Sequence, residues 1–239
     1  MCGIVGVVGN SNAVDILIQG LEKLEYRGYD SAGIYVTDAP DKGCLVKSVG
    51  RIADLRAKIS SDVKGSTGIG HTRWATHGQA TEDNAHPHTS ETGRFVLVHN
   101  GVIENYLQIK EEYLQGHKFK GQTDTEIAVH LIGKFVDEDG LSVLEALKKS
   151  LHIIQGSYAF ALVDSQAPDT IYVAKNKSPL LIGVGEGYNM VCSDAMAMIR
   201  ETSQFMEIHD KELVVLTKDA ITVTDYEGNA IERGTYTAE

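Results

Sequence analysis

The sequence is poor in the residues that mark several classes of protein. Its 239 residues include only three cysteines and four prolines. The cysteines, at positions 2, 44 and 192, form neither a closely spaced pair nor an even set, which argues against a disulfide framework and favours a reducing, cytoplasmic environment. Low-complexity linkers and fixed-period repeats are missing as well. We therefore predict a single domain over residues 1–239.

Positive charge is also scarce. The chain has 22 Lys and Arg against 33 Asp and Glu, which gives a net charge of −11, and it contains no basic run. Nucleic acids and anionic membranes select for clustered positive charge, so we expect neither as a partner. No apolar run approaches the roughly 18 residues of a membrane span. The first basic residue is Lys23, whereas a secretory signal peptide begins with a basic flank.

Hydrophobic patterning predicts several elements in the first half of the chain. Residues 2–8 are an apolar, β-branched run, which predicts a buried strand at the N-terminus. Apolar residues recur with helical spacing between residues 14 and 24. Residues 31–38 and 44–49 suit the two strands of a hairpin. Residues 95–99 form a continuous apolar run that ends in histidine, as expected for a strand covered on both faces.

In the second half, the pattern predicts helices followed by strands. Two capping-box patterns, Thr123 with Glu126 and Ser142 with Glu145, mark helix starts at which two backbone donors are satisfied reciprocally. Six apolar runs then predict strands at residues 158–164, 170–174, 180–184, 190–193, 213–217 and 221–224. Helices and strands in separate runs indicate an α+β fold with mostly antiparallel sheet, and a sandwich with helices outside two packed sheets would use all of them.

Polar residues that no helix or strand requires gather in four stretches, and these are the candidates for chemistry. They are Cys2, residues 26–33, residues 71–78 with the only tryptophan, Trp74, and residues 99–101 followed by Asn105.

Cys2 can supply both a nucleophile and a base. Its small side chain permits an aminopeptidase to remove Met1, which leaves a cysteine with its own α-amine. An α-amine has a pKa of about 7.7–8.0, so near neutral pH a useful fraction is unprotonated and can accept the thiol proton. The alternative is that Cys2 is simply a small apolar residue of the first strand.

Three other positions suggest groups that bind and polarise a substrate. Arg73 can hold a carboxylate through two parallel hydrogen bonds, or it forms an ordinary ion pair. Asn100 and Gly101 can form an oxyanion hole, or a tight Asn-Gly turn. Asp124 can bind an ammonium group, or it only interacts with the dipole of its helix.

Five histidines suggest a rival hypothesis, a metal-dependent hydrolase. They are His71, His77, His86, His88 and His99. No HExxH pattern or carboxylate–histidine spacing accompanies them, so we expect no metal and no other cofactor. Glycine patterns that bind nucleotide phosphates are also missing.

Taken in order, the motifs resemble one known family. Cys2-Gly-Ile-Val-Gly is followed by Leu24-Glu-Tyr-Arg-Gly-Tyr-Asp-Ser-Ala-Gly33, His71-Thr-Arg-Trp-Ala-Thr-His-Gly78, His99-Asn-Gly-Val-Ile-Glu-Asn105 and Thr123-Asp-Thr-Glu126. Over essentially the whole chain this is similar to the N-terminal glutaminase domain of the glucosamine-6-phosphate synthases (isomerising glutamine–fructose-6-phosphate aminotransferases), which are class II glutamine amidotransferases. The second and third stretches look different in the purine-pathway amidophosphoribosyltransferases.

The resemblance implies an N-terminal nucleophile hydrolase fold, a four-layer αββα sandwich of two mostly antiparallel sheets. It implies that Cys2, once Met1 is removed, attacks the side-chain amide of L-glutamine while its own amine relays the proton. Asn100 and the Gly101 N–H would stabilise the tetrahedral oxyanion.

The remaining site residues are also assigned by the resemblance. Arg73, assisted by Thr76 and His77, would hold the α-carboxylate of glutamine, and Asp124 would bind its ammonium group. Trp74 would belong to the loop that closes over the substrate and excludes water.

The resemblance further implies that a second half is absent. In the family, two sugar-isomerase domains bind fructose 6-phosphate, receive the ammonia and carry the main assembly contacts, including those of a homodimer. By itself the chain would be a glutaminase, and Arg27 would support its terminal strand and pocket. A silent glutamine-sensing module would use the same pocket, but such a module is expected to lack Cys2, Asn100 or Asp124, and all three are present.

Overall fold

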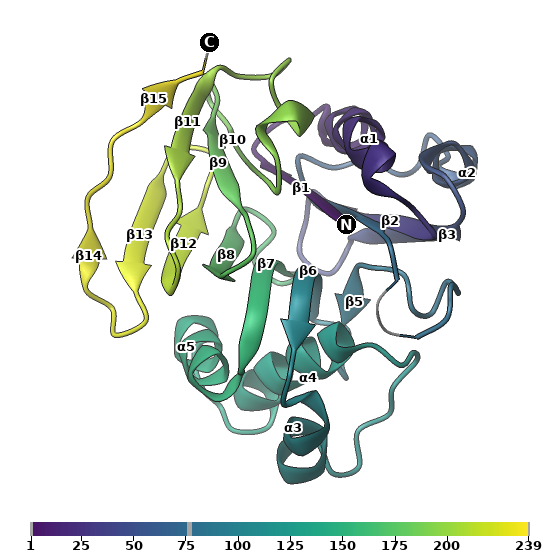
Figure 1. Cartoon of the computed structure of the whole chain (residues 1–239), viewed down its shortest axis with the longest axis vertical. Helices are drawn as coiled ribbons and strands as arrows, with labels where there is room; N and C mark the ends of the chain where they lie inside the picture. Colours follow the sequence, from purple (N-terminus) through teal and green to yellow (C-terminus); the bar gives the residue numbers. More distant parts are fainter. Residues whose placement is uncertain (1, 76–77, 239) are drawn as a thin grey trace.

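Two β-sheets stacked face to face form the centre of the molecule in the computed structural model, which describes residues 2–75 and 78–238 (Figure 1). In the described residues the first sheet has eight strands in the order β15-β11-β9-β10-β1-β4-β2-β3. Their bounds are β1 Gly3–Val8, β2 Ser31–Thr37, β3 Cys44–Val49, β4 Thr67–Arg73, β9 Leu181–Val184, β10 Asn189–Cys192, β11 Gln204–Glu207 and β15 Tyr236–Thr237.

The second sheet has seven strands in the same described ranges, in the order β14-β13-β12-β8-β7-β6-β5. They are β5 His88–Thr89, β6 Phe95–Ile103, β7 Gly156–Asp164, β8 Ile171–Asn176, β12 Glu212–Leu216, β13 Ile221–Asp225 and β14 Ala230–Ile231. Neighbouring named strands pair antiparallel in both sheets. The predicted antiparallel character and the six predicted downstream strands are confirmed.

Helices cover the outer face of each sheet. Figure 1 shows α1 (Ala13–Leu24) and α2 (Ile52–Lys58) on the first sheet, and α3 (Tyr106–Tyr113), α4 (Asp124–Asp137) and α5 (Val143–Ile153) on the second. Short 3₁₀ turns lie at Glu25–Arg27 and Ala195–Ala197. No helix of the described residues is long and apolar enough to cross a membrane.

Three hydrophobic clusters fill the spaces between these layers: α1 and α2 against the first sheet, one sheet against the other, and the second sheet against α3, α4 and α5. Strand β6 shows how the layers are joined. Its Phe95 and Leu97 enter the helix-side cluster, whereas Val96 and Val98 enter the cluster between the sheets. The predicted four-layer αββα sandwich, and the prediction that this strand is covered on both faces, are confirmed.

One of the two predicted capping boxes is wrong. At the start of α5, Ser142 and Glu145 bond reciprocally, at 3.2 and 3.4 Å. At the start of α4, Thr123 accepts the N–H of Glu126 at 3.2 Å. The carboxylate of Glu126, however, accepts the backbone N–H groups of residues 120–121, at 2.8 and 2.9 Å. The loop before α4 therefore supplies better donors than the cap residue does.

Strand β4 has no counterpart in the sequence-based prediction. Its Gly68 and Gly70 interrupt the apolar run that would have indicated a strand. The structure explains both glycines, because a Cβ at Gly68 would lie 2.8 Å from the Cδ1 atom of Leu17, and one at Gly70 would lie 3.1 Å from that of Leu21. Helix α1 thus packs directly on the backbone of β4, which leaves no room for side chains.

Candidate active site

Cys2 contacts the backbone of Trp74 at one end of the first sheet. Strands β1 and β4 are antiparallel neighbours with Gly3 opposite Thr72, so the residue before β1 lies beside the segment that leaves β4. The backbone N–H of Trp74 donates to the sulfur of Cys2 at 3.2 Å, and the thiol lies 3.4 Å from the Trp74 carbonyl oxygen. Pairing of these two strands therefore fixes the position of the thiol.

The surroundings of Cys2 keep its thiol protonated. Burial raises the pKa of Cys2, and the hydrogen bond from the Trp74 N–H opposes this only in part. Since the thiolate is the reactive form, a nucleophilic Cys2 needs a base close by. Cys192 differs, because it lies inside the cluster below α1, where burial also raises the pKa of its thiol and no solvent reaches it.

The second sheet brings Asn100 and Gly101 to the same place. Both lie inside β6, opposite β7, so the alternative of a tight Asn-Gly turn is wrong. The side-chain amide of Asn100 donates to the carbonyl oxygen of Cys2 at 3.2 Å. Gly101 has a φ of +119°, and a Cβ there would lie 2.3 Å from the carbonyl oxygen of Ser157. Only glycine fits this point of the strand.

His71 on β4 fixes the orientation of the Asn100 amide. Its Nε2 atom lies 3.1 Å from the carbonyl oxygen of His99 and 2.9 Å from Oδ1 of Asn100. A carbonyl can only accept, so Nε2 carries the proton, and the Asn100 Nδ2 group is left to donate toward Cys2. Burial lowers the pKa of His71 to about 3, which keeps the ring neutral. Nothing in the sequence pattern assigned this role to His71.

The other described histidines of the rival hypothesis also contact neutral polar groups. His86 stacks on His71, with ring centroids 3.9 Å apart, and accepts the N–H of His99 at 3.3 Å. His88 and His99 each contact a threonine hydroxyl at the start of α4, at 2.9 and 2.8 Å. Burial lowers the pKa of all three rings. His86 therefore packs against the first sheet through His71, whereas His88 and His99 connect the second sheet to the start of α4, all as neutral groups.

Arg73 ends β4 and is almost fully buried. Its guanidinium donates to the carbonyl oxygen of Gln79 at 3.0 Å and lies 3.5 Å from a carboxylate oxygen of Asp30, so the ion pair considered as an alternative is present. Asp30 belongs to the polar stretch 26–33, but sequence reasoning gave it no role. The predicted partners Thr76 and His77 lie outside the described residues.

Asp124 is the first residue of α4. Its Oδ2 atom accepts the N–H of Ile103, at the end of β6, at 2.9 Å, which ties the helix start to the second sheet. Six of the eight predicted site residues line one cavity, together with His86, His99, Thr123 and Thr125: they are Cys2, Arg73, Trp74, Asn100, Gly101 and Asp124.

A more apolar cavity adjoins this one. The two share Cys2, Trp74, Asn100 and Gly101, and the second continues along Arg27, Val102, Ser178, Pro179 and Ser193. Trp74 is 52 % exposed and forms part of both walls. Arg27 pairs with Asp194.

Comparison with known proteins shows to which family the chain belongs. A family model described as a glutamine amidotransferase domain matches residues 71–201, which is more than half of the chain. The chain belongs to the glutamine amidotransferase family. The prediction from the ordered motifs is thereby confirmed at the level of the family.

Curated relatives resemble the chain over its whole length. It is 83% identical to glutamine–fructose-6-phosphate aminotransferase (isomerizing) of Streptococcus pyogenes serotype M1, and 79% identical to the protein of the same name from Streptococcus pneumoniae strain R6. In both cases the match covers 100% of the chain, which spans only 39% of the length of the relative.

Solved structures support the fold. The glutamine phosphoribosylpyrophosphate amidotransferase of B. subtilis, in complex with ADP and GMP, superposes with a TM-score of 0.82 at 29% identity, over 96% of the domain and 50% of that chain. A glutamine aminotransferase class-II domain protein from Silicibacter pomeroyi superposes with a TM-score of 0.56 at 15% identity, over 95% of the domain and 99% of that chain, and shares the fold.

Proposed function

We propose that the amidotransferase domain hydrolyses L-glutamine to L-glutamate and ammonia through a thioester on Cys2. The observation that carries the proposal is the cavity in which a thiol, an amide donor, a guanidinium and a carboxylate converge from separate segments. Glutamine offers the matching groups: a side-chain amide for the thiol, an α-carboxylate for Arg73 and an α-ammonium for Asp124.

The reaction needs Met1 to be removed first, because the base is the amine this exposes on Cys2. That amine takes the thiol proton while the sulfur attacks the amide carbon of glutamine. The resulting oxyanion accepts hydrogen bonds from Asn100 Nδ2 and the Gly101 N–H, and each such donor is worth about 10²–10³ in rate. The amine then gives the proton to the leaving nitrogen, ammonia departs, and water hydrolyses the thioester to glutamate.

Binding and closure involve the remaining residues. Arg73, with Thr76 and His77, holds the α-carboxylate, and Asp124 binds the ammonium. Trp74 moves with the segment that covers the substrate, which excludes water from the thioester. The more apolar cavity that adjoins the site shares Cys2, Trp74 and Asn100 with it, so ammonia released at Cys2 can enter that cavity.

In the whole protein we propose that this ammonia converts fructose 6-phosphate to glucosamine 6-phosphate, in hexosamine biosynthesis. Support comes from the names of the relatives, and from the 39% of their length that the chain spans. The partner would be the sugar-isomerase half of the same polypeptide, with residues 1–239 as one domain and a homodimer formed by the intact enzyme. The three free cysteines support a cytoplasmic location.

The test couples intact mass to glutamate release on one preparation. A sample without Met1 should release glutamate, and its Cys2→Ala variant should not. The glutamine analogue 6-diazo-5-oxo-norleucine should label Cys2 and spare Cys44 and Cys192. A sample that lacks Met1, binds glutamine and releases no glutamate would instead favour the silent sensing module. Activity that survives in Cys2→Ala but is lost with a chelator would favour a metal-dependent hydrolase.

A further inference from the structure

Two histidines and a glutamate form a group that the proposed site does not use. Glu91 lies in the turn between β5 and β6, His117 in the loop between α3 and α4, and His130 within α4. One potential ligand atom from each lies within 4.8 Å of the other two. The group thus joins three segments on the helix-covered side of the second sheet.

The separations between these atoms match those around a single metal ion. The two histidine Nδ1 atoms are 3.0 Å apart. The Oε2 atom of Glu91 lies 3.5 Å from Nδ1 of His130 and 3.9 Å from Nδ1 of His117. Ligands bound tetrahedrally at about 2.0–2.1 Å are about 3.3–3.4 Å from one another. One ion can therefore contact all three atoms with small side-chain movements.

Both imidazole rings also turn their other nitrogen toward a carboxylate. Nε2 of His117 lies 3.2 Å from Glu138 Oε2, and Nε2 of His130 lies 3.9 Å from Glu126 Oε2. Histidines that bind metals commonly donate the second ring N–H to a carboxylate, which fixes the tautomer. With protons on both Nε2 atoms, the two Nδ1 lone pairs and the Glu91 carboxylate face one another, as they would around a bound cation.

Burial makes the site rigid on one side and open on the other. The side chains of His117 and His130 are 6% and 2% exposed, whereas that of Glu91 is 37% exposed. The exposed carboxylate leaves solvent access for an ion and for a water molecule as a fourth ligand.

We propose that Glu91, His117 and His130 bind Zn²⁺, with Glu138 and Glu126 orienting the two rings. Two imidazoles and one carboxylate suit zinc and its transition-metal neighbours, whereas Mg²⁺ and Ca²⁺ prefer ligand sets made of oxygen. The ion would tie the β5–β6 turn and the α3–α4 loop to α4. It is a different group from the histidines behind Cys2, and it is independent of the glutaminase proposal.

The test is titration of the metal-free chain with Co²⁺, followed by displacement with Zn²⁺. One Co²⁺ should bind per chain and give visible d–d absorption without a thiolate charge-transfer band, and Mg²⁺ should not compete. The Cys2→Ala variant should bind Co²⁺ as the parent does, because the site contains no sulfur. Zn²⁺ should raise the Tm of the parent chain.

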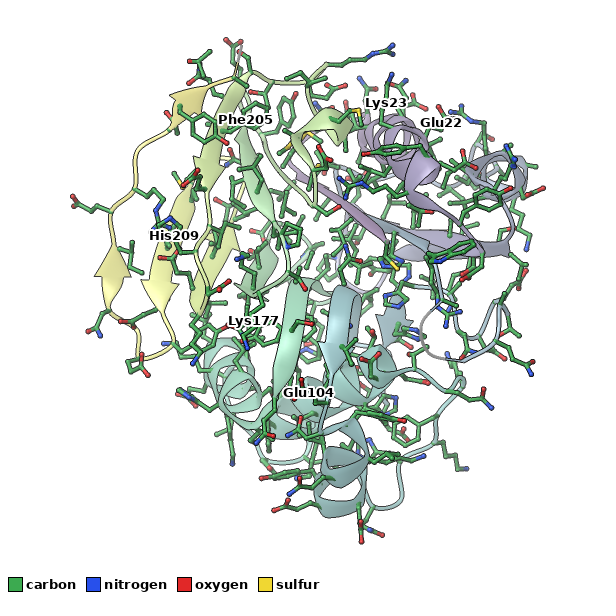
Figure 2. All side chains as sticks on the ribbon, viewed as in Figure 1. Glu22, Lys23, Glu104, Lys177, Phe205 and His209 are labelled. Carbon is green, nitrogen blue, oxygen red and sulfur yellow. The ribbon has the colours of Figure 1, made fainter. Side chains whose placement is uncertain are left out.

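Variants separate this site from adventitious binding. His117→Gln and Glu91→Gln should lower metal affinity by more than about 100-fold, and Glu138→Gln by about 10–100-fold. His209→Gln is the matched control: His209 is exposed, has a carboxylate of Glu207 3.6 Å away, and lies beside the β11–β14 strands, away from α3 and α4 (Figure 2). It should change neither affinity nor the Zn²⁺ effect on Tm.

Three results would overturn the proposal. They are no stoichiometric binding of Co²⁺ or Zn²⁺ by the parent chain, a thiolate band in the cobalt spectrum, and unchanged affinity in His117→Gln and Glu91→Gln. The first would mean that a shared proton, rather than a metal, lies between the two Nδ1 atoms. Glu91→Gln keeps the test decisive if the buried histidine variants fail to fold, since Glu91 is exposed.

Discussion

The two sheets contribute to the proposed active site in different ways. The first sheet offers its groups at strand ends: Cys2 precedes β1, and Arg73 and Trp74 lie where β4 stops. The second sheet offers Asn100 and Gly101 from inside a strand that is paired with β7 along its whole length. In the proposed mechanism, the groups that processing exposes or that close over the substrate lie at strand ends. The proposed oxyanion donors lie inside a strand that is paired along its length, where they are preorganised.

Side-chain hydrogen bonds join the sheets at this point. His71 of the first sheet donates to the side-chain oxygen of Asn100 in the second, and the Asn100 amide donates back to Cys2. The nucleophile and its oxyanion donor are therefore positioned by the same short chain of contacts. Four predictions test this difference between the two sheets, starting with the largest expected effect.

Retention of Met1 should almost abolish glutamate release, although it changes only the part of the site that the first sheet provides. A mass-verified chain that keeps Met1 has an amide at Cys2 in place of the amine, and burial keeps the thiol protonated. Glutamate release should fall by more than about 10³-fold, because the base is lost with the geometry intact. A thiol reagent should still react with Cys2. Appreciable turnover by this form would show that the base lies elsewhere.

Removal of the Asn100 side-chain amide, which the second sheet provides, should lower kcat with little change in KM. For Asn100→Ala we expect a loss of about 10²–10³ in kcat, measured by glutamate release, because the donor acts mainly on the oxyanion. Asn100→Asp, which keeps the acceptor for His71 but not the amide donor, should be similarly impaired. If KM rises and kcat holds, Asn100 binds the ground state instead.

Asp124→Asn separates substrate binding from helix stability. The amide oxygen can still accept the Ile103 N–H, but the charge for the ammonium of glutamine is lost. Losing one partner of a buried charge pair costs about 2–3 kcal/mol, or about 30–150-fold in kcat/KM. If Asp124 only interacts with the helix dipole, kcat/KM stays constant and the chain loses about 0.3–1 kcal/mol of stability.

Lowering the pH should reduce the free energy of unfolding before the carboxylates titrate, because four histidines are buried near the site. The pKa of His71 is about 3 in the folded chain, and burial also lowers those of His86, His88 and His99. The unfolded chain binds protons at these rings below about pH 6.5 and the folded chain does not, so stability falls as the pH drops from 7.5 to 5.5. Each ring contributes up to about 1.4 kcal/mol per pH unit.

Urea unfolding at the two pH values measures this effect. His71→Phe keeps an aromatic ring against His86. It should reduce the difference in unfolding free energy between the two pH values by the contribution of one histidine. His209→Gln, at an exposed position, should leave it unchanged. A midpoint that does not move between pH 7.5 and 5.5 would mean that the buried rings are protonated in the folded chain.

The sequence predicts the elements whose apolar residues are continuous or regularly spaced. Strand β1, helix α1 and strands β7–β10, β12 and β13 follow from local patterns, and the site residues follow from the resemblance carried by the motifs. Strand β4 escapes prediction because Gly68 and Gly70 are dictated by α1, which packs against their backbone. Asn100-Gly101 is typical of a turn, and only the long-range pairing with β7 makes it strand.

Roles that depend on distant partners are also hidden in the sequence. Asp30 and His71 lie within stretches that stand out as polar, but their partners, Arg73 and Asn100, are identified only by the fold. Glu91, His117 and His130 match no metal-binding spacing, since a turn, a loop and a helix bring them together. A residue type shows what chemistry is available, whereas the fold decides where it is used.

We expect the direct connection of Cys2 to β1 to limit the time that is available for removal of Met1 during protein synthesis. Gly3 is buried and lies opposite Thr72, so the backbone that follows Cys2 is held in the first sheet once β1 and β4 have paired. A ribosome that adds about 5–20 residues per second completes β4 within roughly 4–15 s. In the mechanism proposed here, chains that miss this interval fold around an intact Met1 and stay inert. The specific activity of a preparation then reports how fast its N-terminus was processed, as much as how fast the enzyme turns over.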